Sequence, residues 1–126
     1  MKAPLVLVID DDREIVQLVE VTLSGLGYSV QVAYDARQGI ASVFCNPPDL
    51  ILLDLNLPGR DGLTLLKDFR AVPELETVPV IMITGTGVTD VVSQAIQNKV
   101  TDFIIKPFSV ELLVERVAKW LPPPPP

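Results

Sequence analysis

The chain has 126 residues, of which 48% are hydrophobic and 21% charged, with a formal net charge of -6. This length suits one domain with its own hydrophobic core. An acidic chain without a basic run binds nucleic acid phosphates and anionic lipid surfaces poorly, which argues against both as direct partners. No stretch reaches the roughly 18 apolar residues that would span a membrane.

The absence of some residue types excludes several kinds of catalytic and metal-binding site. There is one cysteine and no histidine, which excludes an internal disulfide, a Ser-His-Asp triad and a histidine-rich zinc site. Cys45 falls within an apolar helical pattern, so we expect a buried structural thiol. The N-terminus lacks the features of a signal peptide. A reducing compartment, the cytoplasm, is the expected location.

The first half of the chain alternates predicted strands and helices. Apolar, β-branched runs predict strands at Leu5–Ile9, Tyr28–Ala33 and Leu50–Leu53. Between them, spacings of three and four residues predict helices. The first helix has Ile15, Val19, Leu23 and Leu26 on one face, and the second covers Ala36–Phe44.

The second half continues the alternation. A third helix is predicted at Leu63–Phe69, and strands at Val78–Ile83 and Asp102–Ile105. The fourth helical stripe comprises Val88, Val91, Val92, Ala95 and Ile96, and the fifth Val110, Leu113, Val114, Val117 and Leu121. Helix N-caps are expected at Asp11 or Asp12, at Asp61 and at Ser109.

Five β-α units predict an α/β fold with a parallel sheet covered by helices on both sides. We expect a doubly wound, flavodoxin-like (βα)5 sandwich. The strand order 2-1-3-4-5 is typical of such sheets, although periodicity does not establish it. The tail, Pro122–Pro126, is either a helix stop with a disordered end or the beginning of a stiff linker. Composition does not decide between the two.

Polar residues stand where the predicted strands end. Asp10 and Asp11 follow the first strand, Asp54 ends the third, Thr84 the fourth and Lys106 the fifth. Ligands of doubly wound sheets bind at this carboxyl edge. Converging carboxylates without histidine or cysteine predict a hard cation, Mg²⁺ or Mn²⁺. A hydroxyl and an ammonium beside them suit a phosphate, so Asp54 is a candidate for phosphorylation on its own carboxylate.

This arrangement resembles the receiver domain of two-component response regulators. The matching stretches are LVLVIDDDREI, PDLILLDLNLPGRDGLTLL, VPVIMITG and DFIIKPF, in order along residues 4 to 121. The resemblance implies a receiver domain over residues 1–121 and a tail over 122–126. It also implies a signalling switch that catalyses only its own phosphorylation and dephosphorylation, rather than an enzyme acting on other substrates.

The resemblance also implies roles for individual residues. Asp11 would bind the metal directly and Asp10 through water, while Asp54 would be both phosphoacceptor and ligand. The backbone carbonyl of Asn56 would complete the ligand set. Thr84 and Lys106 would hold phosphoryl oxygens. Three further expectations concern the surrounding loops: a cis Lys106–Pro107 bond, a turn at Pro58 and Gly59, and a tight loop at Gly62.

Phosphorylation would change the surface as Thr84 moves and Phe103 fills the space that it leaves. The expected output surface is the face made by the fourth helix, fifth strand and fifth helix, which is also a possible homodimer contact. Phe103 has no hydroxyl, so the switch could be biased differently from a tyrosine version. A sensor histidine kinase or phosphotransfer protein would supply the phosphoryl group, and an output domain or protein would read it.

Some positions distinguish this chain within the family. Asn56 and Thr86 stand where a hydrolysing water would approach, and they are predicted to set the lifetime of the phosphorylated state. Gly85 leaves the pocket open. Lys99 stands where the family usually has glycine, so that turn was expected to differ.

Three alternative functions are also compatible with parts of the sequence. A degenerate receiver would serve only as an interaction module, although the key residues are all present. A flavodoxin-like cofactor-binding protein is suggested by TGTGVTD, a glycine-rich loop before a helix, but flavodoxins place that loop after the first strand. A hydrolase with an aspartyl-phosphate intermediate would need a second aspartate where Asn56 stands.

Overall fold

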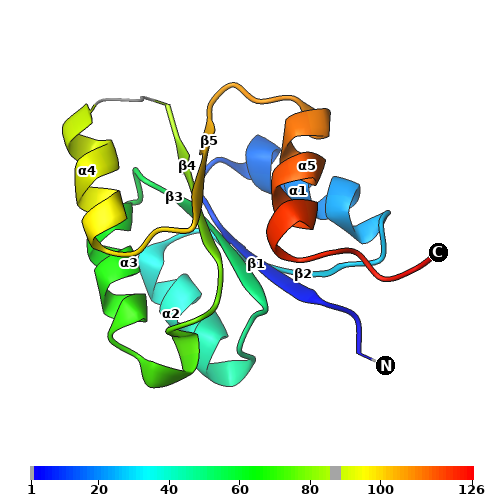
Figure 1. The fold of residues 1–126 in the computed structure, drawn as a ribbon, viewed down its shortest axis with the longest axis horizontal. Helices are drawn as coiled ribbons and strands as arrows, with labels where there is room; N and C mark the ends of the chain where they lie inside the picture. Colours follow the sequence, from blue (N-terminus) through cyan, green and yellow to red (C-terminus); the bar gives the residue numbers. More distant parts are fainter. Residues whose placement is uncertain (1, 86–88) are drawn as a thin grey trace.

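A computed structural model describes residues 2–85 and 89–126, which form five β-α units in the predicted order (Figure 1). The parallel sheet has the order β2-β1-β3-β4-β5, as predicted. The strands are β1 (Leu5–Ile9), β2 (Ser29–Ala33), β3 (Leu50–Asp54), β4 (Val80–Thr84) and β5 (Asp102–Ile105). The helices are α1 (Arg13–Ser24), α2 (Ala36–Cys45), α3 (Gly62–Arg70), α4 (Thr89–Gln97) and α5 (Val110–Trp120), with a 3-10 turn, η1 (Pro73–Leu75), after α3.

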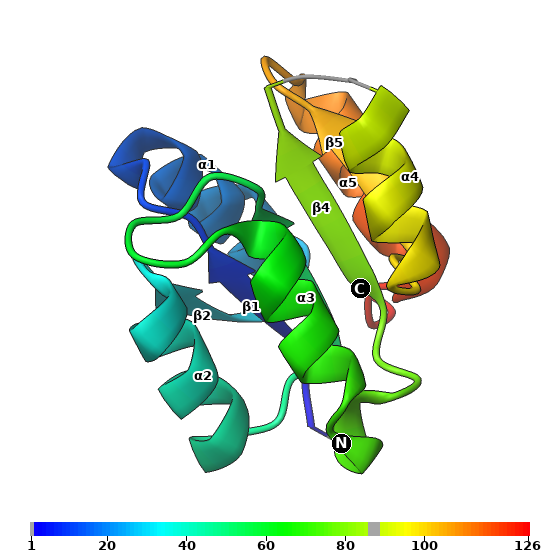
Figure 2. The ribbon, with the colours of Figure 1, turned by 90° about the vertical axis from the view of Figure 1, so that its left-hand side faces the viewer.

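The helices form two layers around the sheet. Figure 1 and Figure 2 show α2, α3 and α4 on one face and α1 and α5 on the other. Each face has its own apolar core, because successive side chains of a strand point to opposite sides. Leu7 and Leu53 belong to the α2-α3-α4 side, and Val8 and Leu52 to the α1-α5 side. Within the described residues, no helix is long and apolar enough to cross a membrane.

Strands β1, β3 and β4 are buried along their whole length, whereas the edge strands β2 and β5 are partly exposed. This agrees with the continuous apolar runs predicted for strands covered on both sides. The parallel register brings the carboxyl ends of the central strands level: Ile9 lies opposite Leu53, Asp54 opposite Ile83, and Thr84 opposite Ile105. The residues that follow these strands therefore meet at one edge of the sheet.

Four predictions about individual apolar side chains were wrong; one of them is Val110 of the fifth stripe, which is 41% exposed at the start of α5. Cys45 is exposed rather than buried, because α2 packs through Ala36, Gly39 and Val43, and residue 45 lies on the opposite side of the helix from Val43. Leu26 lies beyond the end of α1 and is 41% exposed, while Ile96 of α4 is 61% exposed. Val88 lies outside the described residues.

The amino edge of the sheet is held by Arg70, at the end of α3. Its Nη1 donates to the carbonyls of Leu75 and Val78 at 2.8 and 2.7 Å. Its Nε donates to the Lys99 carbonyl at 3.0 Å, and Nη2 lies 3.4 Å from Thr101 Oγ1. One guanidinium thus satisfies carbonyls from two loops that connect α3 to β4 and α4 to β5.

The turn that ends α4 keeps a left-handed residue without using glycine. Lys99 has φ +62°. The amide of Val100 donates to Ala95 O, and that of Lys99 to Ile96 O, both at 3.0 Å. These two bonds form the usual C-terminal motif in which glycine avoids a steric penalty. The turn expected to differ is therefore formed, and Lys99 bears the strain.

We expect Lys99→Gly to stabilise the protein by about 0.5–1 kcal/mol, because glycine adopts positive φ without a clash and its greater freedom in the unfolded chain offsets only part of the gain. Chemical unfolding monitored by circular dichroism would measure this. Lys99→Ala is the matched control, since it removes the same charge but keeps a Cβ, and should show no gain. Equal stability of the two variants would contradict the assignment.

Candidate functional site

The first part of the site is the loop that leaves β1. Asp10 is fully buried, and its amide donates to Ala33 O at 3.0 Å, which continues the β1-β2 pairing by one residue. Asp10 Oδ1 accepts a hydrogen bond from the Asp12 amide at 2.9 Å. Asp11, between them, is exposed. Asp12 is the N-cap of α1 and accepts from the amides of Glu14 and Ile15, so it has the capping role predicted for it.

Asp54 is the last residue of β3 and is 3% exposed. The next amide, that of Leu55, donates to Ile83 O at 2.9 Å and so extends the β3-β4 ladder past the acid. The Asn56 amide lies 3.4 Å from Asp54 Oδ1. The sheet itself therefore fixes where this carboxylate stands.

Gly62 supports Asp54 from behind. A Cβ at this position would lie 2.4 Å from Asp54 O and 2.8 Å from Leu55 Cα, both backbone atoms that cannot move independently. The Gly62 amide donates to Leu55 O at 2.7 Å. The tight approach predicted here is thus the contact of α3 with the end of β3, and glycine is needed because nothing larger fits.

Lys106 completes the group from β5. Its amide donates to Thr84 O at 2.7 Å, and its Nζ lies 3.2 Å from Asp10 Oδ2 and 3.4 Å from Asp54 Oδ1. Thr84 is 2% exposed at the end of β4. The Lys106–Pro107 peptide is cis, as the resemblance implies. The structure therefore places Asp10, Asp54, Thr84 and Lys106 at one edge of the sheet.

Electrostatics make this group costly without a cation. Burial raises the pKa of Asp54 to about 6, the Asp10 charge raises it as well, and Lys106 opposes both. Burial alone would lower the pKa of Lys106, but the Asp10 and Asp54 charges raise it overall. Two buried carboxylates thus share one ammonium, which cannot neutralise both.

The carboxylates fit a hard metal ion. One oxygen from each of Asp10, Asp11 and Asp54 lies within 4.8 Å of the others. Asp10 Oδ2 is buried and, among the described residues, has an ion pair with Lys106 Nζ at 3.2 Å but no assigned hydrogen bond. Such an oxygen is a ready ligand. Oxygen donors of this kind suit Mg²⁺ or Mn²⁺, and the Asn56 carbonyl stays a predicted further ligand.

Other predicted site residues surround this group. Gly85 is exposed, and a Cβ there would meet no atom of the described residues within 4 Å. Gly59 has φ +79° in the turn beyond Asp54, which is compatible with the predicted turn. Asn56 is exposed beside Asp54. Thr86 lies outside the described residues.

Phe103 is half-buried and packs against the core on the α2-α3-α4 side. It lies opposite Met82, two pairs before Thr84 and Ile105. Since side chains two residues apart share a face, Phe103 and Thr84 lie on the same side of the sheet as diagonal neighbours. This is the position needed for one to respond to the other.

A groove next to the site was not predicted. It has a volume of about 400 Å³ and is lined by Asp12, Ile15, Leu18, Lys106, Pro107 and Phe108. Lys106 belongs to both the groove and the carboxylate group, so the groove adjoins the site at this residue. One feature of the sequence could have indicated this groove. Leu18 is apolar but does not belong to the buried stripe of α1, and it is 37% exposed.

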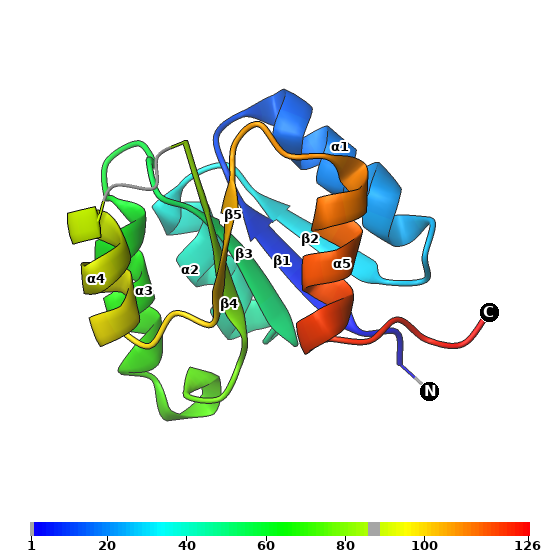
Figure 3. The same cartoon turned by 45° about the horizontal axis from the view of Figure 1, so that its top comes forward.

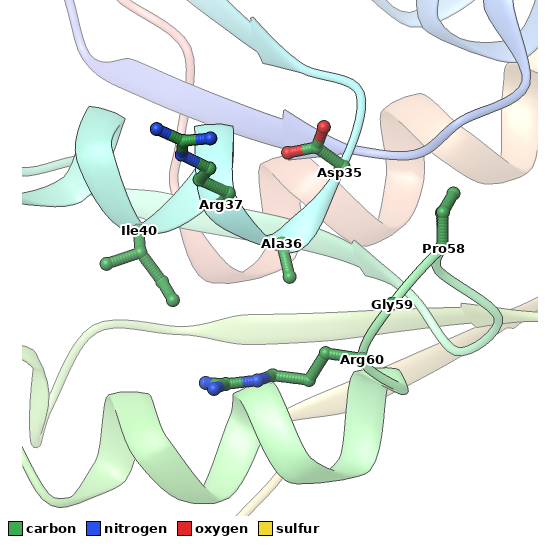
Figure 4. Close-up of a pocket in the computed structure, with 7 residues that line it drawn as sticks. All are labelled: Asp35, Ala36, Arg37, Ile40, Pro58, Gly59 and Arg60. Carbon is green, nitrogen blue, oxygen red and sulfur yellow. The ribbon is translucent and has the colours of Figure 1, made fainter.

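Another hollow lies between α2 and the loop after β3, with a volume of about 540 Å³. Figure 4 shows Arg37 and Arg60 extending along it on opposite sides of Ile40. Arg60 is paired with Asp68, and the Asp35 carboxylate accepts from the Gln38 amide as the α2 cap. Asp10, Asp54 and Lys106 are not among the residues that line this hollow.

Comparison with known proteins agrees with this geometry. The model of the response regulator receiver domain matches residues 6–118, so the chain belongs to that family. It is 40% identical to the dual master transcriptional regulator RpaA of Synechocystis over 94% of this chain and 49% of that protein. It is 36% identical to the transcriptional regulatory protein KdpE of Staphylococcus aureus over 90% of this chain and 51% of that protein.

The fold is also that of solved receiver proteins. The chemotaxis response regulator CheY4 of Vibrio cholerae superposes with a TM-score of 0.90 at 28% identity, covering 95% of this chain and all of that one (100%). The chain spans about half the length of the curated relatives that it matches. Family and fold thus identify a receiver domain of two-component signalling.

The pKa of Asp54 predicts a pH-dependent stability. Its native pKa of about 6 lies above the ordinary value of 3.8, so the unfolded chain releases this proton first. The free energy of unfolding should then fall as pH rises from about 4 to about 6.5, by about 2–3 kcal/mol from this group. Asp54→Asn removes the charge, and should match the wild type below pH 4 and exceed it by that amount at pH 7.5.

Urea unfolding across this pH range in the absence of divalent ions would measure the difference. Asp68→Asn is the control, because that exposed carboxylate pairs with Arg60 at the surface, where such pairs contribute little. A stability gain for Asp54→Asn that is the same at pH 4 and pH 7.5 would show that charge is not its cause.

Proposed function

We propose that this receiver domain accepts a phosphoryl group on the Asp54 carboxylate and converts it into a change of the α4-β5-α5 surface. The observation that carries the proposal is the convergence of three aspartate oxygens within 4.8 Å, with Lys106 Nζ 3.2 to 3.4 Å from two of these residues. Three carboxylates with one ammonium carry an excess of negative charge, which favours binding of a cation. The cation and Lys106 together can then bind a phosphoryl group.

Each residue has a definite part in the transfer. An oxygen of Asp54 forms a bond to phosphorus, while the bond from phosphorus to the donor's nitrogen breaks. Lys106 holds a phosphoryl oxygen by its charge, and Thr84 holds another through its hydroxyl. The metal, bound by Asp10, Asp11, Asp54 and the Asn56 carbonyl, would supply charge neutralisation of the phosphoryl oxygens.

The donor would be a histidine kinase or a phosphotransfer protein. The groove beside Lys106 supports this part of the proposal, because its half-buried Ile15 and Phe108 and exposed Leu18 form an apolar surface against the site. A protein donor needs such a surface to bring its phosphorylated side chain to Asp54. The domain would act as a switch that catalyses only its own phosphorylation and dephosphorylation.

The output surface is supported by exposed apolar side chains. Four large ones lie on α4, β5 and α5: Ile96 (61% exposed), Ile105 (51%), Val110 (41%) and Trp120 (38%). A surface of this kind commonly contacts another protein. An output domain, or a second copy of this domain, is the proposed occupant.

A polar cluster ties β5 to α5 beneath this surface. Asp102 accepts from Trp120 Nε1 at 2.9 Å and from Arg116 Nη1 at 3.2 Å, and Arg116 also donates to Phe103 O at 2.8 Å. Burial alone would raise the pKa of Asp102, but hydrogen bonds from Trp120 and the Phe103 amide, with the Arg116 and Lys119 charges, lower it overall. Because Arg116 of α5 donates to the Phe103 carbonyl, a movement of Phe103 would displace Arg116 and so change the position of α5.

Incubation with acetyl phosphate and Mg²⁺ should add the mass of one phosphoryl group to the chain, measured by intact-protein mass spectrometry. Asp54→Asn should abolish the gain, because the amide is a poor nucleophile, and omission of Mg²⁺ should reduce it severely. Asp61→Asn, an N-cap change close to Asp54 in the chain, is the control and should still be modified.

A folded wild-type protein that takes no phosphoryl group would instead be a receiver that acts only as an interaction module. In the same assay, Asn56→Ala and Thr86→Ala are predicted to change the rate at which the added mass is lost. Unchanged rates in both variants would refute their assigned role in setting the lifetime of the phosphorylated state.

Binding of beryllium fluoride with Mg²⁺, as a phosphoryl mimic, should shift amide NMR signals across residues 84–108. The physical reason is that Thr84 and Phe103 lie on one face of adjacent strands and move together. Phe103→Ala should confine the shifts to residues near Asp54, whereas Phe44→Ala, a change to an exposed aromatic on α2, should leave them intact. No shift beyond the immediate site in the wild type would rule out this output surface.

A further inference from the structure

The five prolines after α5 do not leave the domain freely. Leu121 and Pro124 are half-buried, while Pro122, Pro123, Pro125 and Pro126 are exposed. A polyproline II helix has three residues per turn, so residues 121 and 124 lie on the same side of it. The burial pattern is therefore that of one face of such a helix resting on the protein.

The buried face of the proline segment rests on Gly27, which we call the seat of Pro124. An added Cβ on Gly27 would lie 2.7 Å from Pro124 Cγ and 3.3 Å from Pro124 Cδ. Gly27 also has φ +97°, in the turn between α1 and β2. Pro124 thus packs directly on the glycine backbone, which lets the ring approach closely because no side chain intervenes.

Tyr28 holds the beginning of the segment. Its hydroxyl donates to Leu121 O at 2.6 Å, and the residue is only 4% exposed. Leu121 packs against the core on the α1-α5 side, to which Tyr28 also belongs. The carbonyl at the end of α5 is thereby paired, and the direction of the following residues is set by a buried anchor.

The proline segment then runs beside the other end of the chain. Figure 1 and Figure 3 both show the segment after α5 passing the beginning of β1, at the amino edge of the sheet. A shallow groove there is lined by Lys2, Ala3, Pro4 and Asp49 on one side, and by Leu121, Pro122, Pro124 and Pro125 on the other. This edge lies opposite the one that carries Asp54.

We infer that residues 121–126 form a stiff arm docked on the domain, with Gly27 as the seat of Pro124 and Tyr28 as the anchor of Leu121. Proline rings restrict the free segment already, so docking costs little further entropy and two contacts suffice. Any chain that follows Pro126 would leave from the amino edge in a fixed direction rather than from a flexible tether. This inference does not depend on phosphorylation of Asp54.

The experiment uses the amide that replacement by alanine creates, measured by ¹⁵N relaxation in the full chain. In Pro123→Ala, the new amide should be rigid, with an order parameter of about 0.8, because Pro124 still docks. In Pro124→Ala, the new amide should be mobile, with an order parameter below about 0.6, and the Gly27 and Tyr28 amide signals should shift. Pro123→Ala should leave these two signals in place.

A second comparison tests the seat itself. Gly27→Ala in the Pro123→Ala background should make the residue 123 amide mobile, because the new methyl displaces Pro124. Gly59→Ala is the matched control, since it also has positive φ but open space around its Cβ, and should leave that amide rigid. A mobile residue 123 amide in Pro123→Ala alone, or one that stays rigid after Gly27→Ala, would overturn the proposal.

Discussion

Two buried aspartates facing each other at one edge of the sheet are the constraint on which the site depends. Asp10 and Asp54 are 0% and 3% exposed and lie on adjacent strands, with a single lysine between them. Their repulsion would separate them if their positions were set by side-chain contacts. They are set instead by backbone hydrogen bonds, which continue the β1-β2 ladder into Asp10 and the β3-β4 ladder past Asp54. The sheet therefore imposes an arrangement that the charges oppose.

The repulsion between Asp10 and Asp54 explains why the site attracts positive charge. A carboxylate with its pKa raised to about 6 has an unfavourable charged form, and anything that brings positive charge to it is bound more strongly. Lys106 supplies part of that charge, and a cation would supply more. Asp11 is exposed, so it can be reached by solvent ions at little cost to the core. Gly62 contributes because it lets α3 pack closely against the backbone of Asp54. This packing helps to fix the position of the Asp54 carboxylate.

Much of this could be predicted from sequence, for a physical reason. Continuous apolar runs mark central strands, and the carboxyl ends of parallel strands lie together, so the residues that follow them must meet. Helix periodicity was less reliable. It identifies an apolar stripe but not how much of the stripe is covered, and α4 packs at the edge of the sheet through Ala95 while Ile96 remains 61% exposed. The seat of Pro124 was beyond sequence analysis, because it joins residues 97 positions apart by a contact that neither pattern indicates.

The two edges of the sheet are built on opposite principles. At the amino edge, buried polar groups are paired: Arg70 satisfies carbonyls of two loops, Asp49 accepts from the Leu5 amide, and Tyr28 donates to Leu121 O. At the carboxyl edge, like charges are crowded and Asp10 Oδ2 lacks a hydrogen-bond donor among the described residues. A change of charge at the carboxyl edge alters the balance between the Asp10–Asp54 repulsion and the Lys106 attraction, whereas the polar groups named at the amino edge are paired. Rearrangement on ligand binding should thus be concentrated near Asp54 and along β4 and β5, while the opposite edge keeps the helices and the proline segment in place.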